Sequence, residues 1–251
     1  MFVYSCKHVW EDMLTCIYEA WSSGHGHQNI ALVFDGELQY SLLHTYIHVD
    51  ADAGKAAKVK EAIESRVSKR VYEELTYCSM AYEADVLDVI YRVMILCFAY
   101  GAEALEYVQY RDVMRFKAIL KRVQHEVNRF QEFSRFHAVG GNVYVAHIEP
   151  KSRLVVALGP IFTDRMPSEH WMVIDDVHKE AVIHPKDAPF YLKQLSKEEY
   201  ARLLKTEEHN DVYNDLWQVF FDSIAIEQRR NEKCQTNLFP LWARKHAVEF
   251  M

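Results

Sequence analysis

The stretch "DVMRFKAILKRVQHEVNRFQEFSRFHAVGGNVYVAHIEP", residues 112–150, decides the fold class. In its first part, apolar residues recur three and four positions apart, which predicts an amphipathic helix over residues 112–133. These residues are Val113, Phe116, Leu120, Val123, Val127 and Phe130. The remainder holds two alternating runs joined by Gly140-Gly141-Asn142, a pattern that predicts an antiparallel hairpin.

The flanking sequence repeats both kinds of element. Upstream, we expect short strands at residues 2–5 and 42–50, with helices between and after them, one capped by Asp52 and a second by Ser68. An apolar helix over residues 84–100 is expected to be buried and to end at Gly101. Downstream come further helices and a second hairpin over residues 171–185. Hairpins set between runs of helices predict an α+β chain, mostly helical with short antiparallel hairpins.

Composition and charge limit the classes of protein to which the chain can belong. Residues 1–110 carry 16 acidic and 8 basic side chains, whereas residues 111–251 carry 20 and 21. We therefore expect a single domain over residues 1–251, with an acidic helical part to about residue 110 and a near-neutral part after it. Five scattered cysteines without a CxxC pair favour reduced thiols. With no signal peptide or membrane span in the pattern, the sequence predicts a cytoplasmic protein with no membrane partner.

Common catalytic and metal motifs are missing. The sequence has no Walker A, GxGxxG, HExxH or GxSxG pattern. Among the thirteen histidines, His44 and His48 fall on a predicted strand, about 13 Å apart along it, too far to share an ion. We accordingly predict no metal site and no cofactor.

Basic residues gather in two places. Arg111, Arg115, Arg122 and Arg129 fall within a stripe of about 40° on the helix at 112–133, away from its apolar face. Such a ridge suits a phosphate backbone, and it is equally typical of a solvated helix face. The tail, residues 227–246, sets five basic side chains against Glu227 and Glu232.

The tail also carries a resemblance. The segment "YNDLWQVFFDSIAIEQRRNEKCQTNLFPLWARKHAVEF" resembles the C-terminal signature of a bacterial family of DNA-metabolism and DNA-repair proteins of unknown activity. The matching positions are Ser223–Glu227, Arg229, Arg230, Asn231, Gln235, Pro240, Trp242, Lys245 and His246. Family members are typically encoded beside a radical-SAM protein, and some are fused to a uracil-DNA-glycosylase-like domain.

Two upstream segments are similar to the same family. They are "EFSRFHAVGGNVYVAHIEP" and "LGPIFTDRMPSEHWMVIDD", and the second departs from the family pattern by placing Ile161 where relatives have His. The resemblance implies DNA and a radical-SAM protein as partners, and it leaves open whether the chain is an enzyme.

These observations lead to one main hypothesis, a DNA-metabolism protein that binds the nucleic-acid backbone. Its surface would comprise Arg229, Arg230, Asn231, Lys245, His246, Arg165, Arg135, Arg122 and Arg129. A second hypothesis is a metal-independent enzyme on a small phosphorylated or nucleotide-like substrate, with a pocket of Arg135, Asp164, Arg165, Asp175 and His246. A tail that only clasps the core, and a scaffold without a ligand, are the structural alternatives.

Overall fold

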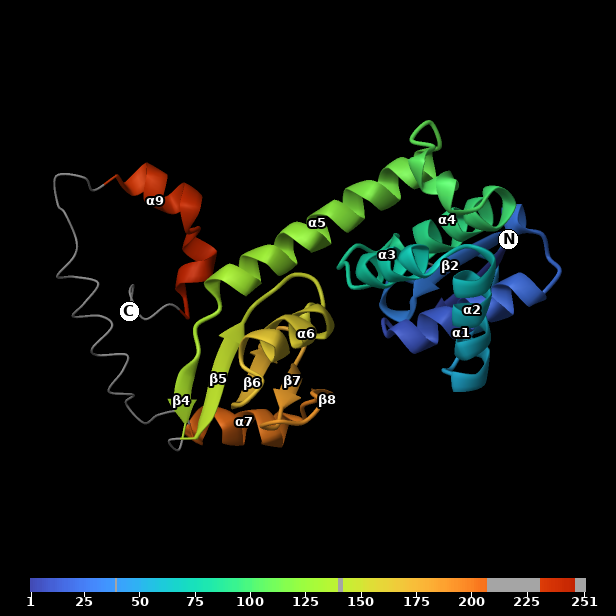
Figure 1. The fold of residues 1–251 in the computed structure, drawn as a ribbon. Coiled ribbons are helices and arrows are strands. Elements are labelled where there is room, and N and C mark those ends of the chain that lie inside the picture. Colours follow the sequence, from blue (N-terminus) through green and yellow to red (C-terminus); the bar gives the residue numbers. More distant parts are fainter. Residues whose placement is uncertain (39, 140–141, 207–230, 247–251) are drawn as a thin grey trace. The chain divides into compact units, whose positions relative to one another are not determined.

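The computed structural model describes residues 1–38, 40–139, 142–206 and 231–246, and the chain divides into two compact units, residues 1–124 and 125–251 (Figure 1). The predicted α+β class is confirmed, because each unit combines helices with a small sheet. Antiparallel hairpins occur at both predicted places, but they do not account for all the strand pairing. The sheet of the first unit is wholly parallel, and the second sheet contains one parallel pair.

The first unit is built on a three-stranded sheet in the order β2-β1-β3. Its strands are β1 (Phe2–Cys6), β2 (Ile30–Phe34) and β3 (Thr45–His48). Its α-helices are α1 (Trp10–Ser22), α2 (Ala53–Arg66), α3 (Lys69–Ser79), α4 (Val86–Tyr100) and the first part of α5 (Arg111–Phe133). Short 3₁₀ turns lie at His27–Asn29, Asp35–Glu37 and Ala102–Glu106. Strand β2 was not predicted, because its apolar run is too short to distinguish from a buried helix segment.

Helix ends in this unit follow the predicted capping residues. The Asp52 side chain accepts a hydrogen bond from the backbone N–H of Lys55 at 3.0 Å, and Ser68 accepts one from Val71 at 3.1 Å. Each bond satisfies a helix N–H that lacks a partner within its own helix. At the other end of α4, Gly101 has φ 77° and its N–H bonds to the Cys97 carbonyl. The local signals were therefore sufficient to set these boundaries.

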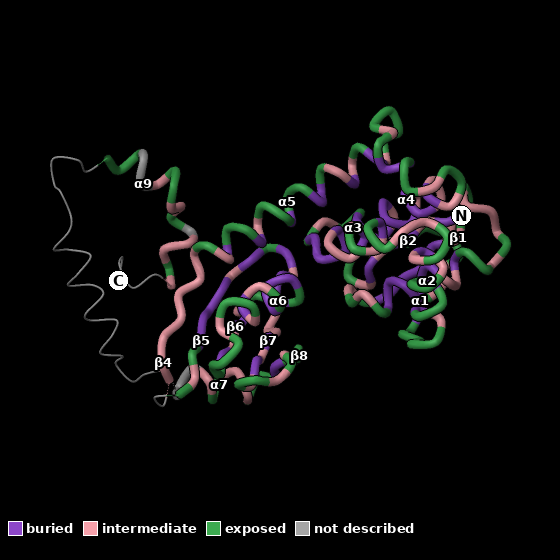
Figure 2. The backbone as a smooth tube through the Cα atoms, in the orientation of Figure 1, coloured by how far each residue is buried: buried purple, intermediate pink, exposed green. Residues whose placement is uncertain are grey.

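Helix α5 has the amphipathic pattern expected of it. The predicted apolar residues are all buried, as is Ile119, while the other positions between them are half-buried or exposed (Figure 2). The boundary between the two units falls inside this helix, after Gln124. The predicted change in charge at about residue 110 thus lies at the start of α5 rather than at the unit boundary.

The second unit contains a five-stranded sheet in the order β4-β5-β6-β7-β8. Its strands are β4 (His137–Val139), β5 (Val143–Ile148), β6 (His170–Asp175), β7 (Glu180–His184) and β8 (Tyr191–Gln194). The other helices described in this unit are α6 (Val155–Arg165), α7 (Lys197–Thr206) and α9 (Glu232–Leu238), and a 3₁₀ turn at Leu241–Arg244 follows α9. β5 and β6 pair in parallel with α6 as the connection between them, and the other pairs are antiparallel.

Helix α7 packs on one face of this sheet. Val145 and Ile174 belong to a buried cluster against which Tyr200 and Leu203 of α7 pack. Because side chains alternate along a strand, His147 lies on the same face of β5 as Val145. The fold thus directs a titratable side chain toward α7 at the end of β5.

Two further expectations concern the whole chain. Within the described ranges, no helix combines the length and the apolar character needed to cross a membrane. Four of the five cysteines, Cys6, Cys16, Cys78 and Cys97, are buried free thiols, and the side chain of Cys234 lies outside those described.

The backbone at Gly101 generates a prediction. Its φ of +77° and ψ of −169° are accessible almost solely to glycine, although a Cβ there would meet no atom within 4 Å. Gly101→Ala should therefore lower the free energy of unfolding by about 1–3 kcal/mol through backbone strain alone. Gly36→Ala is the matched control, because Gly36 also has open space but lacks a positive φ. Equal unfolding free energies for the two variants in chemical denaturation would contradict this explanation.

Candidate functional site

The parallel register of β5 and β6 places two carboxylates side by side. Ile148 pairs with Asp175, and the Asp176 N–H donates to the Ile148 carbonyl at 2.9 Å, which extends the ladder by one step. Glu149 and Asp176 are the next residues along each strand. Since parallel strands end at the same edge, these two side chains meet where functional groups commonly gather in such sheets.

Asp176 is held by two hydrogen-bond donors. His147 Nδ1 lies 2.9 and 3.0 Å from the two Asp176 carboxylate oxygens, and the Tyr200 hydroxyl donates to Oδ1 at 2.8 Å. The His147 and Asp176 side chains are 8% and 10% exposed, so the group is nearly buried. Burial alone would raise the pKa of Asp176, but the His147 hydrogen bond and charge and the Tyr200 hydrogen bond outweigh burial and lower this pKa. Asp176 is therefore ionised at neutral pH.

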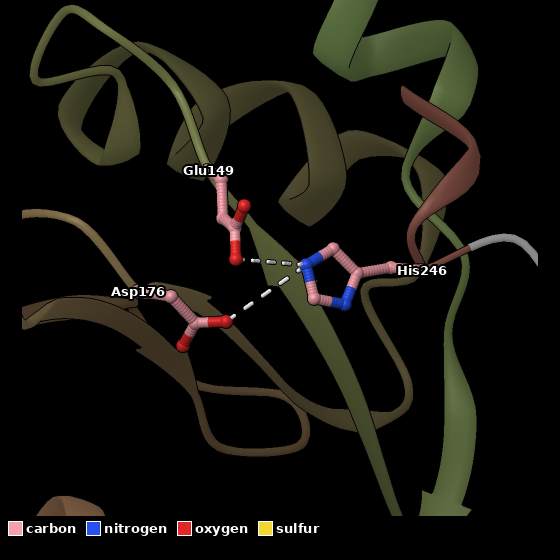
Figure 3. Close-up of side chains that lie close together, drawn as sticks. All are labelled: Glu149, Asp176 and His246. Atoms are coloured by element: carbon pink, nitrogen blue, oxygen red, sulfur yellow. Dashed lines mark ion pairs between the residues drawn. The ribbon is translucent and has the colours of Figure 1, made fainter. Parts of the chain in front are cut away.

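His246 reaches the same edge from the end of the chain. Its Nε2 lies 3.6 Å from Glu149 Oε1 and 3.9 Å from Asp176 Oδ2, pointing into the space between the two carboxylates (Figure 3). Its ring also stacks on His147 with centroids 5.9 Å apart. Burial lowers the pKa of His246, against the opposing charges of Asp176 and Glu149, so its imidazole is neutral at pH 7.

We call Glu149, Asp176 and His246, with the supporting His147 and Tyr200, the strand-end cluster. Lys245 lies at the border of this cluster, because its ammonium pairs with Glu149 Oε1. This hydrogen bond raises the pKa of Lys245. The cluster can bind a cation or move a proton, since it combines two carboxyl groups with a neutral imidazole.

Two of the predicted nucleic-acid residues meet elsewhere in this unit. Arg135 Nη1 donates to the Glu132 carbonyl at 3.1 Å, and Arg165 Nη1 donates to the Gln131 carbonyl at 3.0 Å. These carbonyls are adjacent at the C-terminal end of α5, so two arginines 30 positions apart in the sequence lie at one helix end. We call them the helix-end pair.

The other predicted residues take different positions. Arg122 forms an ion pair with Glu83 in the first unit, and Arg115 of the same ridge makes two hydrogen bonds to Asp85. Arg129 is exposed on α5, and Asn231 is exposed just before α9. Arg229 and Arg230 lie outside the described residues.

Asp175, which the second hypothesis places in a substrate pocket, instead forms hydrogen bonds within a turn. This side chain is fully buried and accepts hydrogen bonds from the backbone N–H groups of Val177 and His178, at 2.9 and 3.0 Å. Its other oxygen lies 2.6 Å from His178 Nδ1. Asp175 thus holds the turn between β6 and β7, while Asp176, the next residue, joins the cluster with His246.

Four residues of the cluster were not predicted as site residues: Glu149, His147, Asp176 and Tyr200. Their convergence depends on a parallel pairing between strands that each also form a hairpin, and the hairpin signals are local. The useful signal would have been polar residues at the ends of two alternating runs, "VYVAHIE" and "WMVIDD".

The chain matches a known protein family. A family model described as a domain of unknown function, DUF4130, matches residues 84–249. The match includes all residues of the strand-end cluster and of the helix-end pair. No curated protein matches the chain.

The Tyr200 hydroxyl is expected to stabilise the fold through ionised Asp176. Tyr200→Phe removes a hydrogen bond to a buried carboxylate and should lower the free energy of unfolding by about 1–3 kcal/mol near pH 7. Tyr191→Phe is the matched control, since Tyr191 is half exposed on β8, and its effect should stay within roughly 0.5 kcal/mol.

The pH dependence of this difference follows from the lowered pKa of Asp176. The advantage of the native chain over Tyr200→Phe should be complete above about pH 4, the ordinary range of an unfolded Asp carboxyl. It should decline as pH falls through the lower pKa of the folded protein. Denaturant melts at several pH values measure this, and a difference that grows in acid would contradict the assignment.

Proposed function

This chain belongs to DUF4130, a family of domains of unknown function, and we propose that it binds the phosphate backbone of nucleic acid in DNA metabolism. The observation that carries the proposal is the helix-end pair. Arg135 and Arg165 come from different segments of the second unit, and both guanidinium groups reach the last carbonyls of α5.

The chemistry of the pair suits a phosphate. A guanidinium presents five N–H donors in a planar fork, so it can hold a helix carbonyl and still donate to a phosphate oxygen. Arg165 is exposed, and its guanidinium lies 5.9 Å from the centre of the Phe162 ring, a contact that limits its orientations. Two charges fixed in this way can bind a polyanion with a small loss of side-chain entropy.

The arginine ridge on α5 offers less positive charge for phosphate binding than its sequence pattern indicates. Arg115 pairs with Asp85 and Arg122 pairs with Glu83, so the positive charge of these two ridge arginines is partly neutralised. We propose that phosphate is bound chiefly by Arg135 and Arg165, together with Arg129 and with Arg229 and Arg230 of the tail.

The DNA context and the radical-SAM partner rest on the resemblance of the tail and the two upstream segments. We propose that the second unit presents nucleic acid to such a partner. The strand-end cluster supplies titratable groups in the same unit.

The helix-end pair gives the first test. Binding of a single-stranded and a duplex oligonucleotide is measured by fluorescence anisotropy over a series of salt concentrations. Arg135→Gln with Arg165→Gln should weaken binding and flatten the slope of log affinity against log salt by about 0.7 (single strand) or 0.9 (duplex) per lost phosphate contact. Lys186→Gln, an exposed basic residue of the same unit, is the charge-matched control for each substitution. An unchanged affinity and slope in the double variant would refute the proposal.

The tail arginines give the second test. Arg229→Glu with Arg230→Glu should abolish oligonucleotide binding while the melting temperature stays nearly constant, if the pair faces phosphate. If these arginines instead clasp Glu227 and the core, the melting temperature should fall and binding per folded molecule should persist. That second result would remove the tail from the binding surface.

A further inference from the structure

We propose that Glu149, Asp176 and His246 form a binding site for a divalent transition-metal cation, with one imidazole nitrogen and two carboxylate oxygens as ligands. The inference goes beyond phosphate binding, because neither residue of the helix-end pair is a ligand. It also gives His246, predicted as a nucleic-acid contact, a different role.

The geometry of the three ligand atoms fits a shared cation. His246 Nε2 lies 3.6 and 3.9 Å from the two carboxylate oxygens, and the three ligand atoms all lie within 4.8 Å of one another. These separations are too long for good hydrogen bonds. Ligands bound about 2.1 Å from a tetrahedral ion stand about 3.4 Å apart, so small side-chain shifts would complete the site.

The imidazole nitrogen needs a partner. His246 Nε2 is buried and makes no hydrogen bond to any residue in the described part of the chain. Buried polar nitrogens are almost always satisfied, and an unsatisfied one requires an explanation. The atom faces both carboxylates (Figure 3), so a cation between the three groups would satisfy it and balance the two negative charges.

The surroundings already orient one ligand. His147 and Tyr200 hydrogen-bond the Asp176 carboxylate and fix its direction, the role that outer partners have around protein-bound metals. A carboxylate oxygen has lone pairs for both a hydrogen bond and a metal. One nitrogen and two oxygens suit Zn²⁺, Mn²⁺ or Fe²⁺, and three protein ligands leave coordination positions open for water or an oxygen of a ligand.

Lys245 is the natural competitor of a metal at this site. Its ammonium contacts Glu149 Oε1, the oxygen that faces His246. A bound cation would repel the ammonium and displace it toward Glu149 Oε2 or solvent. Removing this charge should therefore strengthen metal binding, which distinguishes a true site from adventitious binding by surface carboxylates.

The test uses the full chain, freed of metal with a chelator and titrated with ZnCl₂ or MnCl₂ by calorimetry. We expect one equivalent to bind per chain. Glu149→Gln, Asp176→Asn and His246→Gln should each weaken binding at least about tenfold, whereas Lys245→Gln should bind more tightly than the native chain. His125→Gln, which changes an exposed histidine of the same unit, should have no effect.

A second measurement covers any variant that fails to fold. Co²⁺ added to the native chain should give the visible absorption bands of a four- or five-coordinate ion, and addition of Zn²⁺ should abolish them. The proposal is overturned if no metal binds to the native chain, if binding survives all three ligand substitutions, or if Co²⁺ shows only the weak spectrum of its hydrated ion. Loss of metal binding with intact oligonucleotide binding would not affect the proposed function. The metal site and the phosphate-binding function can therefore be refuted independently.

Discussion

The parallel pairing of β5 with β6 is the constraint on which the second unit depends. It requires a crossover, which α6 provides, and it brings the carboxyl ends of both strands to one edge. The two adjacent hairpins extend the sheet outward from this central pair. Without the parallel register, Glu149 and Asp176 would lie at opposite ends of their strands, and neither His246 nor Tyr200 would have a common carboxylate to approach.

The elements that could be predicted are those whose signals are local. Asp52, Ser68 and Gly101 mark helix ends through their own side chain or backbone, and the apolar stripe of α5 is visible in its spacing. The α+β class could be predicted from these elements. Strand β2 and the pairing partners of β1 could not, because parallel strands are joined through long connections that leave no turn signal.

The residues of the candidate site were likewise predictable only where their signals are local. Lys245 and His246 were singled out as basic tail residues, but their carboxylate partners lie about 70 to 97 positions away in the sequence. The arginine ridge shows the opposite problem. Its spacing on α5 was read correctly, whereas Asp85 and Glu83, which pair with Arg115 and Arg122, belong to the α3–α4 connection. A charge pattern on one helix therefore predicts a surface only after the charges of its neighbours are known.

The position of His246 has a consequence for the folding of the chain. Its ring and the Lys245 ammonium attach the end of the described chain to a sheet edge formed some 70 residues earlier. An ion can bind more tightly when Lys245 and His246 lie at the sheet edge than when they do not. By linkage, such an ion stabilises the docking of these two residues by the difference between its two binding free energies. Ion binding at the sheet edge and the docking of Lys245 and His246 there are then two expressions of a single equilibrium.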